Sequence, residues 1–332
     1  MPARTELEEI DFRTLSSEGR EALMVQAAKG YYELDRTMAD IAKSLGLTRF
    51  QVARLLKDAR EQGVVRIEIV PRAQRRPDLE AALQRTYGLR EAIVVPNLRD
   101  DDGLIDMAAQ AAGQFLAGLV PRPALVGVSW GRTMASVAYW LPHRWNDGVE
   151  VVLLNGAMNI HATELRTNNI AELFASAGNG RAILLPVPAM VGRAETRIVL
   201  EQDPVIADAL SLGQKATVVC FGLGGMTPDS VLVRSGSLAE TDIVRLSKRG
   251  AVGDLLGRFV DSAGRIVDTS LDARTIGLDP LALRDKEIAM GVAVGHRKHQ
   301  IVLAALRAKL VNVLVTDEQT ARVAMEAAHA GK

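Results

Sequence analysis

The stretch Thr37-Met-Ala-Asp-Ile-Ala-Lys-Ser-Leu-Gly-Leu-Thr-Arg-Phe-Gln-Val-Ala-Arg-Leu-Leu-Lys-Asp-Ala-Arg60 contains two helical patterns of apolar residues separated by a glycine. Thr37 precedes the first pattern and can cap a helix N-terminus with its side chain. Gly46 follows that pattern, where a helix end favours a residue with positive φ. Thr48 begins the second pattern and Gln51 lies three residues later, which is the spacing of a capping box. The stretch therefore predicts two helices joined by a tight turn.

The second of these helices has two unlike faces. At about 100° per residue, one face collects apolar residues that must pack inward: Val52, Leu55, Leu56 and Ala59. The opposite face carries Phe50 among polar and basic side chains. Arg and Lys can pair with guanine edges or phosphates, Gln with adenine, and an exposed Phe with a thymine methyl group. We therefore expect a DNA-recognition helix whose contacts come from Thr48, Arg49, Phe50, Gln51, Arg54 and Lys57.

The charge around this helix favours the same interpretation. Ten basic and four acidic residues lie between Arg36 and Arg76, a net charge of +6, whereas the whole chain carries 40 residues of each sign. Residues 64–70 alternate in polarity like the hairpin of a winged helix-turn-helix. Such a domain would bind double-stranded operator DNA less tightly as salt rises. The alternative is a three-helix interaction module that uses the same turn for packing.

The length of 332 residues suggests two domains. Residues 1–17 are polar and are expected to be flexible, and residues 18–70 form the predicted helix-turn-helix domain. Residues 71–77 are charged and bounded by prolines, as a linker would be. Residues 78–332 form the second, larger domain.

Composition also suggests a compartment. A single cysteine, Cys220, excludes a disulfide within one chain and favours a reducing environment. The first residues lack the apolar core of a secretion signal, and no apolar run approaches the roughly 20 residues that span a bilayer. We expect a cytoplasmic protein without a membrane partner.

From Ala92 onward, short β-branched runs alternate with longer helical patterns. This rhythm predicts an α/β domain with a mostly parallel, Rossmann-like sheet covered by helices on both faces. The expected strands are 93–95, 124–129, 149–154, 182–185, 216–221, 287–294 and 312–315. The expected helices are 18–34 in the first domain and 78–87, 104–119, 133–140, 165–175, 300–310 and 319–328 in the second.

Motifs in both domains resemble the SorC family of bacterial sugar-responsive regulators. In the first domain they are Ala39–Leu47 and Val52–Ile67; in the second they are Val126–Thr133, Leu154–Ala157, Leu185–Ala189, Gly250–Phe259 and Lys309–Glu318. The resemblance implies a sensor domain related to sugar-phosphate isomerases and deaminases, and a dimeric or tetrameric homo-oligomer. It also implies operator binding controlled by a sugar, polyol or sugar phosphate. We expect no cofactor.

The turn Ser129-Trp-Gly-Arg-Thr133 is the first candidate for the effector site. Its glycine lets the backbone approach a ligand, and the helix that follows offers unpaired N–H groups to a phosphate. The resemblance places Ser129, Gly131 and Thr133 in the pocket. Arg132 could add a positive charge or could point to solvent.

Four further segments supply candidates with an alternative structural role. Asn155 could bind hydroxyl groups, or Asn155 and Gly156 could form only a turn. The glycine-rich strand end with Gly222 and Gly224 could be a ligand loop or a tight turn. Asp254 could bind a sugar or cap a turn. Gly295 opens a helix, and by resemblance Lys298 presents its charge to a phosphate; His296 and His299 lack a third metal ligand, so we expect no metal site.

All these candidates follow strands, and the carboxyl ends of strands are where open α/β sheets bind ligands. The sequence therefore predicts one effector site from Ser129, Gly131, Arg132, Thr133, Asn155, Gly156, Gly222, Gly224, Asp254, Gly295 and Lys298. The competing hypothesis is a sugar-phosphate isomerase or deaminase. An enzyme would need a positioned acid and base, and Asp254 has no evident partner base in the sequence, so no catalytic residue is expected.

Overall fold

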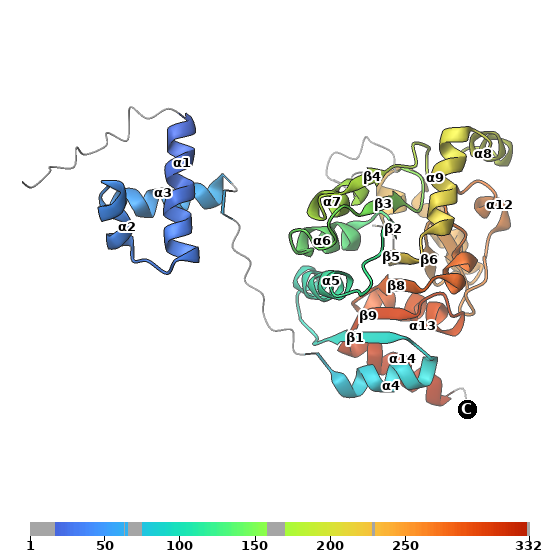
Figure 1. The fold of residues 1–332 in the computed structure, drawn as a ribbon. Coiled ribbons are helices and arrows are strands. Elements are labelled where there is room, and N and C mark those ends of the chain that lie inside the picture. The colour runs from blue at the N-terminus through green and yellow to red at the C-terminus, as the bar shows by residue number, and fades with distance from the viewer. Residues whose placement is uncertain (1–16, 63, 66–74, 158–169, 228–229, 331–332) are drawn as a thin grey trace, which may run out of the picture. The chain divides into compact units, whose positions relative to one another are not determined.

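The computed structural model describes residues 17–62, 64–65, 75–157, 170–227 and 230–330. The chain divides after Arg72 into two compact units, and each is described by itself. The first unit contains α1 (Ser17–Ala28), the π-helical turn η1 (Lys29–Glu33), α2 (Met38–Leu45) and α3 (Arg49–Glu61). Helices α2 and α3 form the predicted helix-turn-helix (Figure 1).

The caps of this unit agree with the sequence pattern. The Thr37 hydroxyl accepts the Asp40 N–H at 3.2 Å, and Gly46 ends α2 with φ of 66°. Thr48 and Gln51 form the capping box: the Thr48 hydroxyl accepts the Gln51 N–H at 3.3 Å, and Oε1 of Gln51 accepts the Thr48 N–H at 2.7 Å. These bonds pair donors that a helix N-terminus otherwise leaves without a partner.

The predicted single helix over 18–34 is instead an α-helix followed by a π-helical turn. Gly30 lies in that turn, and a Cβ there would come 3.1 Å from Cγ1 of Ile41. The glycine thus allows α2 to pack closely. Of the predicted wing, residues 66–70 lie outside the described part of the chain, while Val64 and Val65 pack against the core of the unit.

The second unit is built on a parallel sheet, as predicted. Its strand order is β1 (Glu91–Val95), β9 (Val313–Asp317), β8 (Ile288–Val292), β5 (Val218–Gly225), β2 (Leu125–Val128), β3 (Glu150–Leu153) and β4 (Arg181–Ile183). Every pairing among these seven strands is parallel. Cys220 lies in the middle of β5 and is fully buried, as expected of a small apolar residue.

Helices cover both faces of the sheet (Figure 1). One face packs against α5 (Asp101–Ala117), α6 (Arg132–Trp140) and α7 (Ile170–Ala177), and the other against α4 (Pro77–Tyr87), α9 (Pro204–Lys215), α13 (His299–Arg307) and α14 (Glu318–Ala330). Strand β1 shows why both faces are apolar. Ile93 and Val95 join the core under α5, whereas Ala92 and Val94 join the core under α4 and α14.

Several short elements were not predicted. Strands β6 (Gly253–Leu255) and β7 (Arg258–Val260) form an antiparallel hairpin on the end of β5, which extends to Gly225 and not only to Phe221. Three residues are too few to show the two-residue period of a strand. The unpredicted helices are α8 (Ala194–Glu201), α9, α10 (Val231–Arg234), α11 (Glu240–Lys248) and α12 (Thr269–Asp272), together with the 3₁₀ turns Pro280–Asp285 and His296–Lys298.

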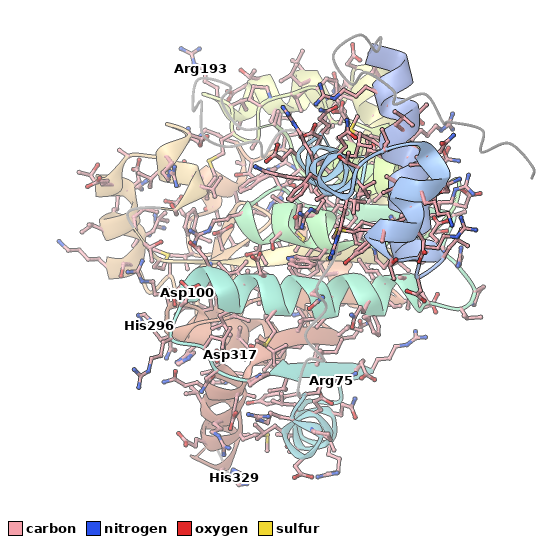
Figure 2. The ribbon with its side chains drawn as sticks, turned by 90° about the vertical axis from the view of Figure 1, so that its left-hand side faces the viewer. Arg75, Asp100, Arg193, His296, Asp317 and His329 are labelled. Atoms are coloured by element: carbon pink, nitrogen blue, oxygen red, sulfur yellow. The ribbon has the colours of Figure 1, made fainter. Side chains whose placement is uncertain are left out.

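The second unit begins before Asp78, the residue at which we expected it to start. Arg75 lies beside β1 and α4 (Figure 2), with its Nε 2.7 Å from Oε1 of Glu80. Arg76 makes an ion pair of 2.7 Å with Glu318. These contacts fasten the last residues of the predicted linker to α4 and α14, and residues 71–74 lie outside the described part of the chain.

The strand order creates a switch point. From β2 the chain proceeds outward to β3 and β4; it then returns to β5, next to β2, and proceeds outward on the other side to β8 and β9. The connection after β2 thus leads toward one edge of the sheet, and the connection after its neighbour β5 leads toward the other edge. Such a reversal opens a crevice at the carboxyl ends of the two strands.

Candidate DNA-binding and effector sites

Helix α3 presents its polar face to solvent. Phe50 is 89% exposed, while the opposite face is buried through Val52, Leu55, Leu56 and Ala59. Arg49 and Arg54 are also exposed, and Lys57 lies 3.6 Å from Glu61 one turn along the helix. An aromatic ring held outward beside two arginines has no packing role within the described unit.

Gln51 is constrained by its second role. Its Oε1 accepts bonds from the Thr48 N–H and hydroxyl, at 2.7 and 2.9 Å. Bidentate pairing with adenine needs both the amide oxygen and the amide nitrogen, so it would compete with the capping box. With the box intact, the Gln51 amide can offer a base only its N–H donors.

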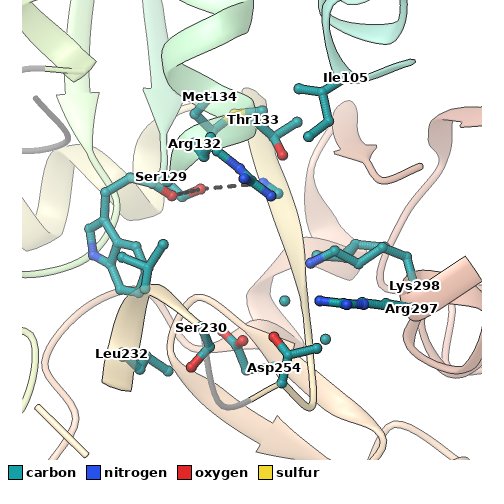
Figure 3. Close-up of a pocket in the computed structure, with 18 of the residues that line it drawn as sticks. Ile105, Ser129, Arg132, Thr133, Met134, Ser230, Leu232, Asp254, Arg297 and Lys298 are labelled. Carbon is teal, nitrogen blue, oxygen red and sulfur yellow. Dashed lines mark hydrogen bonds between the residues drawn. The ribbon is translucent and has the colours of Figure 1, made fainter. Parts of the chain in front are cut away.

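A pocket in the second unit lies at the carboxyl ends of β2, β3, β5 and β8 (Figure 3). Ten of the eleven predicted effector residues line it: Ser129, Gly131, Arg132, Thr133, Asn155, Gly222, Gly224, Asp254, Gly295 and Lys298. Gly156 does not. The crevice expected from the strand order is therefore where the candidate residues meet.

The turn from β2 to α6 is built for close approach. Gly131 has φ of 130° as the N-cap of α6, and a Cβ there would meet nothing within 4 Å. The first N–H groups of a helix lack intrahelical partners. Ser129 is 2% exposed, and its hydroxyl accepts the Gly222 N–H at 3.4 Å, which ties β2 to β5. The Arg132 side chain is exposed at the rim of the pocket, with Nη1 3.9 Å from Oδ1 of Asp102.

Asn155 follows β3 and is a buried amide in the wall of the pocket. It is 1% exposed, yet neither Oδ1 nor Nδ2 has a hydrogen-bond partner among the described residues. A buried polar group without a partner costs about 1–3 kcal/mol. The amide thus has donors and an acceptor to offer a molecule that enters the pocket.

Gly156, by contrast, has a packing role. Its carbonyl accepts Nε1 of Trp130 at 3.0 Å, and a Cβ at this position would come 2.6 Å from the carbonyl oxygen of Pro188. Of the two roles considered for this pair, Asn155 fits the ligand-binding one because it lines the pocket, whereas Gly156 fits the turn-forming one.

Asp254 combines the two roles that the sequence left open. In β6 it pairs with Gly224, it is 8% exposed, and its Oδ2 accepts the Gly257 N–H at 3.2 Å. It therefore caps the β6–β7 turn and also lines the pocket. A Cβ at Gly224 would overlap the carboxylate, so this glycine makes room for Asp254. Burial raises the pKa of Asp254, while the Lys298 charge and the Gly257 N–H act in the opposite direction.

Gly295 and Lys298 lie on the far side of the pocket (Figure 3 shows Lys298 and Arg297). Gly295 has φ of 90°, and its N–H donates to Oδ2 of Asp317 at 2.7 Å. Asp317 is 1% exposed and fixes the start of the 3₁₀ turn that carries Lys298. His296, the residue after Gly295, is exposed.

His299 is less exposed than a surface histidine. Its Nε2 is buried and has no hydrogen-bond partner among the described residues, and burial lowers the pKa of its imidazole. Within the described residues, no group of three or more potential His, Cys, Asp or Glu ligands is arranged to hold a metal ion.

The sequence did not reveal the residues that close the rest of the pocket. They include residues from the start of α5, the indole after Ser129, the α10 segment, the hairpin turn and the turn before α13: Asp101, Leu104, Ile105, Trp130, Ser230, Val231, Leu232, Arg234, Leu256, Gly257, His296 and Arg297. Helix α10 has only four residues, so it shows no helical period. The one available signal was Trp130, an indole within the strand-to-helix turn.

Comparison with known proteins identifies the class to which these two units belong. A family model described as a sugar-binding domain matches residues 72–326. The chain is 33% identical to the deoxyribonucleoside regulator of Bacillus subtilis over 91% of its length and 97% of the relative. It is 30% identical to the sorbitol operon regulator of Klebsiella pneumoniae over 92% of its length and 98% of that relative.

Solved structures agree. The full-length sorbitol operon regulator SorC of K. pneumoniae superposes with a TM-score of 0.70 and 28% identity, over 92% of this chain and 98% of that one. A domain of a sugar-binding transcriptional regulator from Arthrobacter aurescens superposes with a TM-score of 0.67 and 28% identity, over 78% of this chain and 100% of that one. The chain belongs to the SorC family of sugar-binding transcriptional regulators, and the relatives support a regulator, not an isomerase or deaminase. None of the helices in the described ranges is long and apolar enough to span a membrane.

Replacing Asp254 should stabilise the protein at neutral pH. Because burial raises the pKa of Asp254 above that of the unfolded chain, its ionised form destabilises the fold as pH rises through the folded pKa. Asp254→Asn should therefore raise the Tm at neutral pH, and this advantage should shrink as the pH falls through the folded pKa and the carboxyl group becomes protonated. Calorimetry across this pH range measures the difference.

Asp268 provides a control of opposite sign. Burial raises its pKa, but the Leu271 N–H and the charges of Arg249 and Arg245 outweigh burial and hold the pKa below its usual value. Asp268→Asn should lower the Tm at neutral pH, with a loss that fades as pH falls through the folded pKa. A lower Tm for Asp254→Asn at neutral pH would contradict the description of this carboxyl group.

Proposed function

We propose that the chain binds operator DNA through α3 and that a sugar phosphate bound at the β2–β5 crevice controls this binding. The single observation that carries the proposal is Asn155, a fully buried amide that lines the pocket without a hydrogen-bond partner among the described residues. An amide oxygen and nitrogen together match a hydroxyl group, which both donates and accepts.

The charges around Asn155 favour a phosphorylated ligand. Lys298 lies on one side of the pocket and the N-terminus of α6 on another. Helix N-termini and ammonium groups bind phosphate oxygens by charge-assisted bonds. The Asp254 carboxylate would accept hydrogen bonds from the hydroxyl groups of the sugar. A free sugar or polyol would use Asn155 and Asp254 but not the cationic side.

The names of the relatives support the same class of compound. One is named a deoxyribonucleoside regulator and another a sorbitol operon regulator, so both names refer to polyhydroxylated compounds. We therefore place this chain in the control of genes that handle such a compound, in the bacterial cytoplasm where operator DNA lies.

A homo-oligomer, a dimer or tetramer, is part of the proposal. A single recognition helix reads only a few base pairs, and helix-turn-helix proteins reach useful affinity by binding two half-sites together. The exposed face of α3 supplies the base and phosphate contacts, with Thr48, Arg49, Phe50, Gln51, Arg54 and Lys57 as the proposed set.

Thermal unfolding with added compounds tests the effector site. The panel is ribose 5-phosphate, glucose 6-phosphate and sorbitol 6-phosphate, each beside its unphosphorylated form, since binding to the folded state raises apparent stability. We expect stabilisation by a phosphorylated member. Asn155→Ala should reduce its affinity roughly tenfold or more, through the loss of about 1.5 kcal/mol of hydrogen bonding, and Lys298→Ala should reduce it by at least as much.

The outcomes separate the alternatives. Equal stabilisation by a sugar and its phosphate would retain the pocket but contradict the role of Lys298. Stabilisation that survives Asn155→Ala unchanged would contradict the proposed site itself. Arg85→Ala, an exposed arginine on α4 that does not line the pocket, is the charge-matched control for Lys298→Ala.

Substitutions on α3 test the DNA-binding face. Arg54→Ala and Phe50→Ala should each weaken operator binding by about 1–3 kcal/mol, roughly tenfold or more, as expected for base or phosphate contacts. Because both side chains are exposed, thermal stability should change by no more than about 0.5 kcal/mol. Fluorescence anisotropy with labelled duplex, at two salt concentrations, measures the affinity.

The same Arg85→Ala variant serves as control for Arg54→Ala and should leave operator binding unchanged. Full affinity in both α3 variants would show that another surface contacts the DNA.

A further inference from the structure

Arg258, the first residue of β7, is a buried arginine that does not line the pocket. Its side chain is only 2% exposed, and its Nε lies 2.7 Å from Oδ1 of Asp272. Nη1 donates to the carbonyl of Leu278 at 2.9 Å, and Nη2 donates to the carbonyls of Thr275 and Gly277, both at 3.2 Å. Only a guanidinium, with its planar fork of donors, can bind one carboxylate and three carbonyls at once.

The segment that supplies these carbonyls runs along the end of β3. The Leu278 N–H donates to the carbonyl of Leu154 at 2.7 Å, and the Gly156 N–H donates to the carbonyl of Ile276 at 3.1 Å. Asn155 lies between these two bonds. Its backbone is therefore held by the same segment that Arg258 binds.

Arg258 also follows directly after the turn between β6 and β7, and β6 contains Asp254. The Gly257 N–H donates to the Asp254 carboxylate, and both Leu256 and Gly257 line the pocket. A Cβ at Gly257 would lie 3.7 Å from Cγ2 of Thr275, so the hairpin turn and the bound segment are in close contact. Arg258 thus joins the wall that bears Asp254 to the wall that bears Asn155.

This link matters because the Asn155 amide has no hydrogen bond to hold it within the described residues. The position of its backbone must therefore set where the amide points. We infer that Arg258 is a positioning residue for the effector site, which fixes Asn155 relative to Asp254 across the pocket without touching the ligand. The inference rests on the proposed function, since it concerns the same site.

Hydrogen exchange on the full-length protein without ligand tests the positioning directly. Arg258→Lys keeps a positive charge for Asp272, but one ammonium cannot reach three carbonyls and a carboxylate. We expect the Gly156 and Leu278 amides to exchange at least about tenfold faster in this variant, because opening of the segment becomes easier. Unchanged exchange would overturn the inference.

Arg249→Lys is the matched control. Arg249 makes an ion pair of 2.7 Å with the buried carboxylate of Asp268 and does not line the pocket. In both variants lysine replaces an arginine that pairs with an aspartate, although the Arg258 side chain is 2% exposed and the Arg249 side chain 47%. The two variants therefore share the loss of a guanidinium–carboxylate pair. The Gly156 and Leu278 amides should respond only to Arg258→Lys; an equal response to Arg249→Lys would show a general structural effect and overturn the inference.

Calorimetry with the panel member that binds the wild type most tightly, among ribose 5-phosphate, glucose 6-phosphate and sorbitol 6-phosphate, completes the test as a double-mutant cycle. Arg258→Lys should lower its affinity about tenfold in the wild-type background but less than about twofold in Asn155→Ala, because residues that act through one another are not additive. Equal losses in both backgrounds, or no loss in either, would overturn the role of Arg258.

Two further readouts keep the two claims distinct. Operator binding by Arg258→Lys within about twofold of wild type would show that the fold is intact and that the effect is confined to the effector site. No binding of any panel member to the wild type would overturn the proposed function, and with it the inference, even if hydrogen exchange shows that Arg258 holds the segment.

Discussion

The proposed effector site depends on one constraint, the topological switch point between the parallel neighbouring strands β2 and β5. Because the chain leaves these strands toward opposite edges of the sheet, a crevice opens at their carboxyl ends. The Ser129 hydroxyl bridges the two strands at this point through the Gly222 N–H. The turns that follow β2, β3 and β8 then converge on the crevice and bring their polar residues to one place.

The pocket holds two groups that weaken the fold. The Asn155 amide is buried without a partner among the described residues, and burial raises the pKa of the Asp254 carboxyl. Natural proteins commonly retain such unfavourable groups where function needs them. In this pocket both groups face the same space, and both would gain hydrogen bonds from the hydroxyl groups of a sugar. The buried Arg258 network behind them binds the segment beside Asn155, whose own amide has no hydrogen bond among the described residues.

The sequence was sufficient to predict the long, regular elements. Thr48 and Gln51 specified the start of α3 through a local capping box, and β-branched runs specified the seven parallel strands. These features depend on neighbours within a few residues, so they can be read without the fold. Ten predicted effector residues meet at the pocket because most of them follow strands of the same parallel sheet, while Gly222 and Gly224 lie in β5 and Asp254 lies in the hairpin strand paired to it.

The remaining features depend on distant contacts. The β6–β7 hairpin has three-residue strands whose pairing is fixed by β5 and by the Arg258 bonds to residues 275–278. Gly156 looked like a ligand residue beside Asn155, yet its role follows from the carbonyl of Pro188, about thirty residues away. Helix α10 closes the pocket with only four residues. Periodicity cannot report contacts of this kind.

The two units are functionally coupled only if effector binding to one changes the affinity of the other for operator DNA. Thermodynamic linkage requires that an effector which alters DNA affinity must itself bind with different affinity to the DNA complex. The most direct measurement is therefore a calorimetric titration of the full-length protein with the panel member that stabilises it most, with and without saturating operator duplex. We predict two dissociation constants that differ by about 5- to 150-fold, the usual range of allosteric coupling. Equal constants would contradict control of DNA binding by this site.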